Sequence, residues 1–152
     1  MMKRTAAILV FGIALLVGGV HASDIEKGFD AYGKGDYVEA VKWFRLSADQ
    51  GNAEAQYYLA FMYDNGKGVT QDFKEAVKWH RLSAEQGNAN AQTSLGFMYV
   101  LGQGVIQDDV YAHMWWNIEA EGGSSRAKKN RDKVASGVDI NLTLSGHFGD
   151  SM

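Results

Sequence analysis

The 152-residue sequence contains no cysteine and no proline. Without cysteine the chain cannot form disulfides, so packing alone must hold the fold together. Without proline its helices lack the residue that most often interrupts them. The sequence also has no excess of basic residues, and its formal net charge of −3 makes nucleic acid and anionic membrane surfaces poor partner candidates.

The longest apolar run of the sequence lies at the beginning of the chain. Two basic residues precede an apolar run over residues 6–20, which ends in Val20-His21-Ala22. This arrangement is typical of a secretory signal peptide. A retained membrane anchor is the alternative, but the run is shorter than the roughly 20 residues that span a bilayer. We expect a leader over residues 1–22, cleavage after Ala22 and a periplasmic or secreted protein with no membrane contact after cleavage. No cysteine follows the cleavage site, which excludes a lipoprotein.

One segment occurs twice, 36 residues apart. "AVKWFRLSADQGNAEAQ" begins at Ala40 and "AVKWHRLSAEQGNANAQ" begins at Ala76, and residues 40–75 and 76–111 are identical at 23 of 36 positions without a gap. A more divergent third copy begins at Ala112. The three copies share, in register, Trp43, Trp79 and Trp115, then Leu46, Leu82 and Ile118, then Gly51, Gly87 and Gly123. A sustained period of this length indicates a repeat protein.

Each period predicts two helices joined by glycine turns. The segment 52–63 carries apolar residues at helical spacing, and Asn52 is suited to cap its first turn. Gly51 ends the helix before it. The glycines of the loop "GKGV" over residues 66–69 then end the first helix of the pair.

The second helix of each period is predicted to begin with a capping-box-like pair of carboxylates, Asp72 with Glu75. Its buried face is expected to carry Ala76, Trp79 and Leu82 at helical spacing. Such a pair has an apolar face too broad to cover alone, so neighbouring pairs stack into an α-solenoid.

The residues of the second unit resemble the Sel-one-like repeat, a branch of the tetratricopeptide-like solenoids. The matching positions are Ala55, Leu59, Ala60, Tyr63, Gly66, Gly68, Val69, Asp72, Ala76, Trp79, Ala84, Gly87 and Ala89. The resemblance extends over roughly residues 25–134, and the first unit looks more like an ordinary tetratricopeptide unit. The expected fold class is all-α, a right-handed α-solenoid of about three antiparallel helix pairs plus a C-terminal capping helix.

The expected repeat domain covers residues 23–135. Its predicted parts are units over residues 25–51, 52–87 and 88–123 and a cap over residues 124–135. Arg131 and Asp132 replace apolar residues of the repeat in the cap, as a terminal unit facing water requires. The turn-rich stretch 136–152 is expected to be a disordered tail. A truncated or frameshifted reading frame is an alternative explanation of its composition.

No set of residues converges on a catalytic, cofactor or metal site. His80 and His113 are interpreted as surface residues, because neither a cysteine nor a His-x3-His pair completes a metal site. The loops "GKGV" and "GQGV" follow a helix, whereas a phosphate-binding loop precedes one, so we interpret them as helix-ending turns. Some cysteine-rich secreted members of the family that the repeats resemble are penicillin-binding or β-lactamase-like. The resemblance therefore leaves a cell-wall or β-lactam hydrolase as the alternative to a protein without catalysis.

The resemblance implies that the first helix of each pair lines a concave face where a partner segment binds. The candidate partner-binding residues are Phe29, Glu54, Tyr57, Phe61, Asp64, Asn65, Asn90, Thr93, Phe97 and Leu101. A small residue followed by phenylalanine recurs on all three first helices, at Phe29, Phe61 and Phe97. These rings form either an aromatic strip for a partner or packing between repeats.

Residues that differ between copies are expected to hold the specificity. The main differences are Glu54/Asn90, Tyr57/Thr93, Tyr58/Ser94 and Asp64/Val100. The sequence thus predicts a non-catalytic adaptor of the bacterial cell envelope that binds a protein or peptide. The partner is either bacterial or from a host, and self-association through an end face of the short solenoid is a further possibility.

Overall fold

The computed structural model of the chain describes residues 24–123, 128–129 and 132. The predicted leader and the predicted tail lie outside the described residues, as does most of the predicted cap over residues 124–135.

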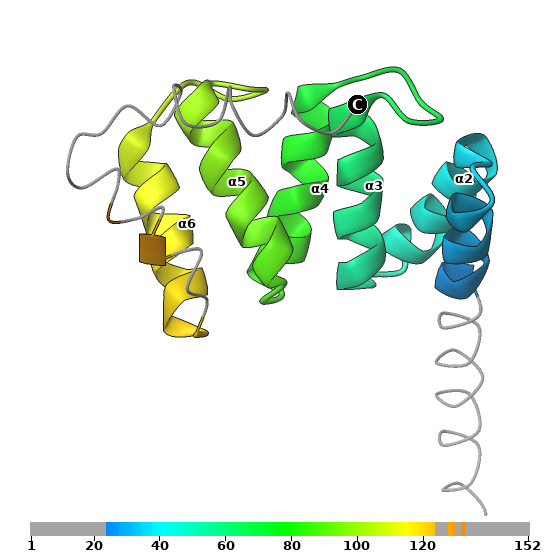
Figure 1. The fold of residues 1–152 in the computed structure, drawn as a ribbon, viewed down its shortest axis with the longest axis horizontal. Helices are drawn as coiled ribbons and strands as arrows, with labels where there is room; N and C mark the ends of the chain where they lie inside the picture. Colours follow the sequence, from blue (N-terminus) through cyan, green and yellow to red (C-terminus); the bar gives the residue numbers. More distant parts are fainter. Residues whose placement is uncertain (1–23, 124–127, 130–131, 133–152) are drawn as a thin grey trace, which may run out of the picture.

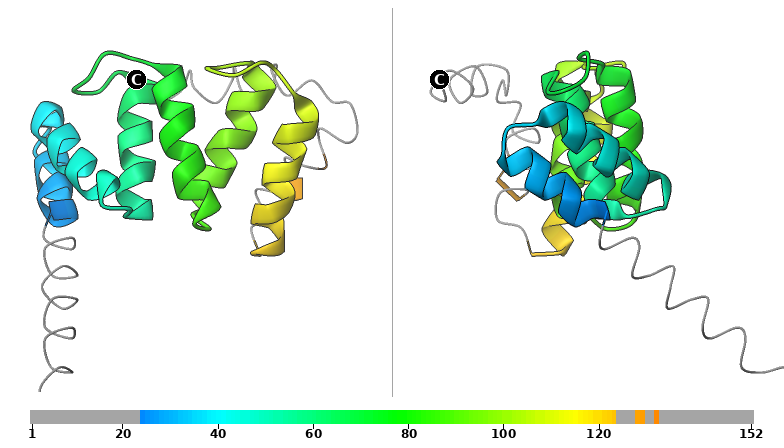
Figure 2. Two further views of the ribbon diagram at one scale, coloured as in Figure 1. Left: turned by 180° about the vertical axis from the view of Figure 1, so that it is seen from behind. Right: turned by 90° about the vertical axis from the view of Figure 1, so that its right-hand side faces the viewer.

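The described chain is built of helices that stand in a row in chain order (Figure 1). Residues 24–33 are helical, and the further helices are α2 (Tyr37–Asp49), α3 (Ala53–Asn65), α4 (Phe73–Glu85), α5 (Ala89–Leu101) and α6 (Asp109–Glu121). From α2 onward each helix packs chiefly against the next one along the chain. Figure 2 shows the same row from behind and from one end. No strand occurs in the part of the chain that the structure describes, and the predicted all-α solenoid is confirmed.

The helices of the described region are short. Each helix from α2 to α6 has 13 residues. Among the residues described, no helix is long and apolar enough to cross a membrane.

Local sequence determines where the helices begin. The Asn52 side chain accepts a hydrogen bond from the backbone N–H of Ala55 at 2.9 Å. Asp72 Oδ1 accepts hydrogen bonds from the backbone N–H groups of Lys74 and Glu75 at 3.0 and 3.1 Å. The equivalent caps of the other helices are Asp36, Asn88 and Asp108. The predicted helix starts at Asn52 and Asp72 are therefore confirmed.

The glycine loops end the first helix of each pair, as predicted, and also join neighbouring pairs. Gly66 closes α3 with a φ of 63°. A Cβ atom on Gly68 would lie 2.2 Å from the carbonyl oxygen of Tyr37, and one on Gly104 would lie 2.3 Å from that of Phe73. Tyr37 and Phe73 begin the second helix of the preceding pair, so each loop backbone lies directly on that helix start.

The largest fully buried side chains of the second helices are Phe44, His80 and Trp116, which occupy equivalent repeat positions. The prediction that His80 lies on the surface is therefore wrong. Its side chain is 1 % exposed, and burial lowers its pKa to about 3, so the ring is neutral. Within the described residues, His80 Nδ1 has no hydrogen-bond partner.

The neighbouring positions of the second helices divide between core and solvent. Trp79 and Trp115 are buried, and Trp43 is half-buried. Leu82 is exposed, and the expectation that it belongs to the buried face is wrong. A helix turns by about 100° per residue, so position 82 points about 200° away from the buried position 80.

Candidate partner-binding site

Nine of the ten predicted partner-binding residues are at least partly accessible. Glu54, Asn65 and Asn90 are exposed, and Phe29, Tyr57, Phe61, Asp64, Phe97 and Leu101 are half-buried. Burial raises the pKa of the Asp64 carboxyl above its ordinary value.

Thr93 is the exception, because it is buried between α5 and α6. Its hydroxyl contacts the Glu119 carboxylate and also donates a hydrogen bond to the carbonyl oxygen of Ala89 at 3.1 Å. At the position equivalent to Glu119, α4 has Ser83, whose hydroxyl donates to the Ala53 carbonyl oxygen at 2.6 Å instead. The prediction that Thr93 faces a partner is therefore wrong, since the longer Glu119 side chain covers it.

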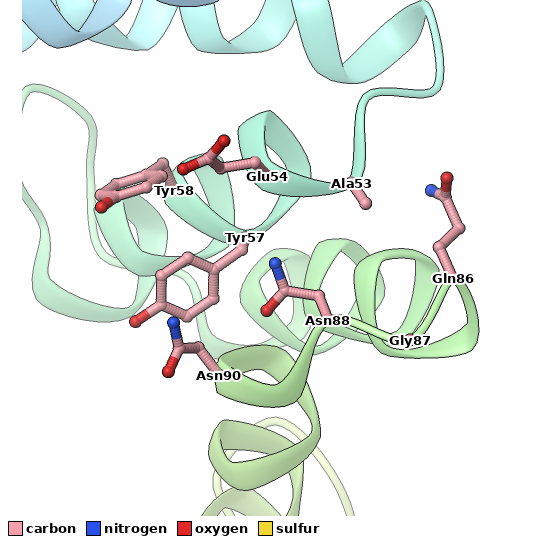
Figure 3. A pocket seen from close by; sticks show the side chains of 8 residues that line it. All are labelled: Ala53, Glu54, Tyr57, Tyr58, Gln86, Gly87, Asn88 and Asn90. Atoms are coloured by element: carbon pink, nitrogen blue, oxygen red, sulfur yellow. The ribbon is translucent and has the colours of Figure 1, made fainter. Parts of the chain in front are cut away.

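A hollow of about 340 Å³ opens between the start of α3 and the turn from α4 to α5 (Figure 3). Its lining consists of Ala53, Glu54, Tyr57, Tyr58, Gln86, Gly87, Asn88 and Asn90. The hollow thus brings together three predicted residues, Glu54, Tyr57 and Asn90, from two neighbouring repeats. The remaining candidates, Phe29, Phe61, Asp64, Asn65, Thr93, Phe97 and Leu101, do not line it.

Amide side chains form one wall of the hollow. Gln86 Nε2 donates to Gln56 Oε1 at 2.7 Å, and Gln56 Nε2 in turn donates to the carbonyl oxygen of Ala48 at 3.1 Å. Asn88 caps α5 through its side-chain oxygen, and its amide nitrogen points toward Tyr57 in Figure 3. Sequence reasoning missed Gln86 and Asn88 because both recur in the repeats and have a structural role there.

Aromatic rings form the opposite wall and continue into the core. The Tyr57 ring centroid lies 5.2 Å from that of Tyr58 and 5.6 Å from that of His80. Tyr58 stacks on Phe44 at 5.3 Å and meets Phe29 edge-on at 4.8 Å. The tyrosines are therefore held by buried rings behind them, and a partner would meet an ordered surface.

The recurring phenylalanines contact other groups of the same chain. Phe97 meets Trp116 edge-on at a centroid distance of 5.2 Å. The ammonium group of Lys67 lies 5.4 Å from the centre of the Phe61 ring. Both contacts lie within a single repeat unit, and they match packing inside the chain better than an aromatic strip for a partner.

The described residues provide no metal site, because no three His, Asp or Glu side chains gather closely enough among them. His113 is half-buried, and its Nδ1 lies 2.9 Å from Asn117 Nδ2. A Ser-x-x-Lys spacing, which β-lactamases use, occurs at Ser125 and Lys128. Ser125 lies outside the described residues, and Lys128 is exposed.

The sequence profile of the Sel1 repeat matches residues 23–52, 53–88 and 89–124, which together are more than half of the chain. The chain belongs to the Sel1 repeat family. Sel1 repeats generally mediate protein–protein interactions, and proteins built of them are generally non-catalytic scaffolds.

Solved structures of other Sel1 repeat proteins share the fold. A Sel1 repeat protein from Oxalobacter formigenes superposes with a TM-score of 0.70 at 29% identity, over 76% of this chain and 48% of that one. A protective antigen of uropathogenic Escherichia coli, c5321, superposes with a TM-score of 0.68 at 37% identity, over 72% of this chain and 24% of that one. Cysteine rich protein B of Helicobacter pylori superposes with a TM-score of 0.57 at 19% identity, over 60% of this chain and 68% of that one. This similarity supports the fold alone.

A curated relative is the exopolysaccharide production negative regulator of Rhizobium leguminosarum bv. viciae. It is 47% identical over 45 residues, which are 30% of this chain and 17% of the regulator. The similarity therefore covers about one repeat and a small part of that protein's length.

Proposed function

We propose that this Sel1 repeat protein is a non-catalytic adaptor of the bacterial cell envelope that binds a segment of another protein at the hollow between α3 and α5. The observation that carries the proposal is that Glu54, Tyr57 and Tyr58 line one open hollow together. All three differ from the equivalent residues of the next repeat. Many residues that the repeats share cap helices or fill the core, whereas these three differ and line a surface that a partner can reach.

The chemistry of the hollow suits an extended peptide with a basic side chain. The amide groups of Gln86, Asn88 and Asn90 both donate and accept hydrogen bonds, as a peptide main chain requires. Tyrosine rings attract a cation to their faces, and Glu54 adds the only carboxylate among the lining residues. The proposed ligand is therefore a peptide that places a lysine or arginine between Glu54 and the tyrosines.

Binding to an array of short peptides with and without lysine or arginine tests this proposal. The variant Glu54→Asn introduces the residue that the next repeat carries at position 90, so it removes the charge and retains a polar group. We expect its affinity for the basic peptides to fall about tenfold, since a charge-assisted contact contributes about 1.5 kcal/mol.

The matched control is Glu85→Asn, because Glu85 is an exposed carboxylate that does not line the hollow. It should bind like the unaltered chain. Equal losses in both variants, or equal binding of basic and uncharged peptides, would contradict the assignment of the hollow.

The proposed envelope location rests on the predicted leader over residues 1–22. N-terminal sequencing of the protein from a periplasmic fraction is expected to find a chain that begins at Ser23. A cytoplasmic protein that keeps residues 1–22 would contradict the envelope location. The non-catalytic role is tested with nitrocefin and with peptidoglycan. Turnover that a single substitution in the hollow abolishes would replace the adaptor with a hydrolase.

A further inference from the structure

The outward-facing positions of α2 and α4 carry paired charges. On α2, the Lys42 ammonium lies 2.9 Å from the Glu39 carboxylate, and on α4 the equivalent Lys78 lies 3.5 Å from Glu75. Lys74, one turn before Lys78, adds a further exposed charge on α4. These charges lie beside exposed apolar residues, Val38 and Leu46 on α2 and Leu82 on α4, so a lysine stands at the centre of each outer face.

The equivalent positions of α6 carry no charged residues. Uncharged residues, Val110, Tyr111 and Met114, stand at the positions of the three charged residues of α4. Val110 is 79 % exposed, Met114 40 % and Ile118 43 %, and Ile106 just before the helix is 90 % exposed. Exposed apolar residues that gather on one face are typical of a surface that associates with another molecule. We call Val110, Met114 and Ile118 the α6 stripe.

The α6 stripe is complementary to itself. Its members are spaced four residues apart, so they form one ridge along the helix. When two copies of α6 pack antiparallel about a two-fold axis at Met114, Met114 meets Met114 of the second copy. Val110 then meets Ile118 of the second copy, and Glu121 faces the uncharged Gln107 of the second copy. The pairing therefore buries apolar groups on both sides and opposes no like charges.

Charge makes α6 the favourable helix for this contact. The chain has a formal net charge of −3, so two copies repel each other over most approaches. The same two-fold pairing through α4 would place Lys78 against Lys78 of the second copy, and pairing through α2 would do the same with Lys42. The α6 stripe carries no charge and avoids both penalties.

We propose that the chain forms a two-fold dimer in which the α6 stripes of two copies pack antiparallel. The stripe shares no residue with the lining of the hollow in Figure 3, so partner binding and dimer formation are separate properties. A stripe on one helix offers less than the roughly 800 Å² per partner of a standard interface. The dimer should therefore be reversible and depend on protein concentration.

Disulfide crosslinking of the full chain tests the proposal, because the sequence has no cysteine to interfere. The variant Met114→Cys places one thiol at the proposed two-fold axis, where it meets its own copy. The matched control is Lys78→Cys, at the equivalent position of α4. With copper phenanthroline as oxidant, we expect the dimer to form at least about tenfold faster in Met114→Cys, because association raises the local thiol concentration.

The register is tested by mixing single-cysteine variants. Val110→Cys mixed with Ile118→Cys should crosslink faster than either variant alone. In sedimentation of the chain without cysteine, Met114→Lys restores the residue type of α2 and α4 and should yield monomers, while circular dichroism should show an unchanged helix content. Equal crosslinking rates at positions 114 and 78 would mean that a second copy of the chain does not cover the α6 stripe, which would overturn the proposal. A dimer that persists in Met114→Lys would overturn it as well.

Discussion

His80 occupies the position at which the flanking helix pairs have Phe44 and Trp116. Its ring lies behind Tyr57, at a centroid distance of 5.6 Å, and so supports the aromatic wall of the hollow. A buried polar atom without a hydrogen bond costs about 1–3 kcal/mol. His80 therefore supports the wall of the hollow but lowers the stability of the fold, which a phenylalanine at this position would not do.

We predict that His80→Phe raises the free energy of unfolding at pH 7 by about 1 kcal/mol, because it removes an unpaired buried nitrogen and introduces the residue of the first pair. The gain should increase as the pH falls. Between the ordinary histidine pKa of 6.5 and the folded value of about 3, the unfolded chain binds a proton that the folded chain excludes. Each pH unit in that window then costs the unaltered protein about 1.4 kcal/mol. Urea unfolding at pH 7 and pH 5 measures both effects.

The control for this prediction is His113→Phe, since the His113 side chain is half-buried rather than enclosed in the core. The stability difference between His113→Phe and the unaltered protein should change much less with pH. A gain from His80→Phe that is the same at pH 7 and pH 5 would show that His80 titrates in the folded protein.

At the scale of elements, the loop between α3 and α4 also packs against the preceding helix pair. The Lys67 ammonium lies 5.7 Å from the Tyr32 ring centre, 5.3 Å from that of Tyr37 and 5.4 Å from that of Phe61. Each such contact contributes about 0.5–1 kcal/mol at an exposed site. Gly68 completes the connection, because its backbone lies on the start of α2 with no room for a side chain.

We predict that Gly68→Ala lowers the free energy of unfolding by more than about 2 kcal/mol. The new methyl group would enter a left-handed backbone conformation, which costs about 1 kcal/mol, and would also collide with the Tyr37 carbonyl. Gly51→Ala is the control, because Gly51 has a φ of 92° and no atom within 4 Å of the added Cβ. Urea unfolding should show a clearly larger loss for Gly68→Ala, and equal losses would mean that the loop moves away freely.

At the scale of the whole molecule, contacts run from each helix to the next along the chain. Stability in such a repeat array is approximately a sum of the repeats and of the interfaces between neighbours. Damage at one end should then spread only a short way, and the central pair α3–α4, which has neighbours on both sides, should be the most protected.

We predict that Trp116→Ala opens the C-terminal pair and leaves the rest folded. Trp116 is fully buried, meets Phe97 edge-on and donates a hydrogen bond to the Thr93 carbonyl oxygen at 3.3 Å. Its truncation should cost about 3–5 kcal/mol. Amide hydrogen exchange should rise in α5 and α6 and change little in α2 to α4, whereas the exposed control Leu82→Ala should leave every helix unchanged. Equal loss of protection in all helices after Trp116→Ala would show that the solenoid unfolds as a single unit.

The amino-acid sequence by itself determined the helices, their ends and the fact that they stack. The caps at Asn52 and Asp72 bind backbone groups two or three residues away, and Gly66 ends α3 through its own φ. Such interactions are local, so the order of residues is enough to predict them. The period of 36 residues was equally decisive, since a single helix pair cannot cover its own apolar face.

Only the tertiary structure decided which side chains are buried and which come together at the surface. His80 and Leu82 point about 200° apart around α4, and contact with Tyr57 of α3 decided that the His80 side is the buried one. Thr93 is hidden because Glu119, 26 residues later, covers it. The hollow likewise joins Glu54 and Tyr57 to a turn about thirty residues further along the chain. Helical periodicity orients a side chain around its own axis, but the contacts that decide burial and binding depend on the neighbouring helix.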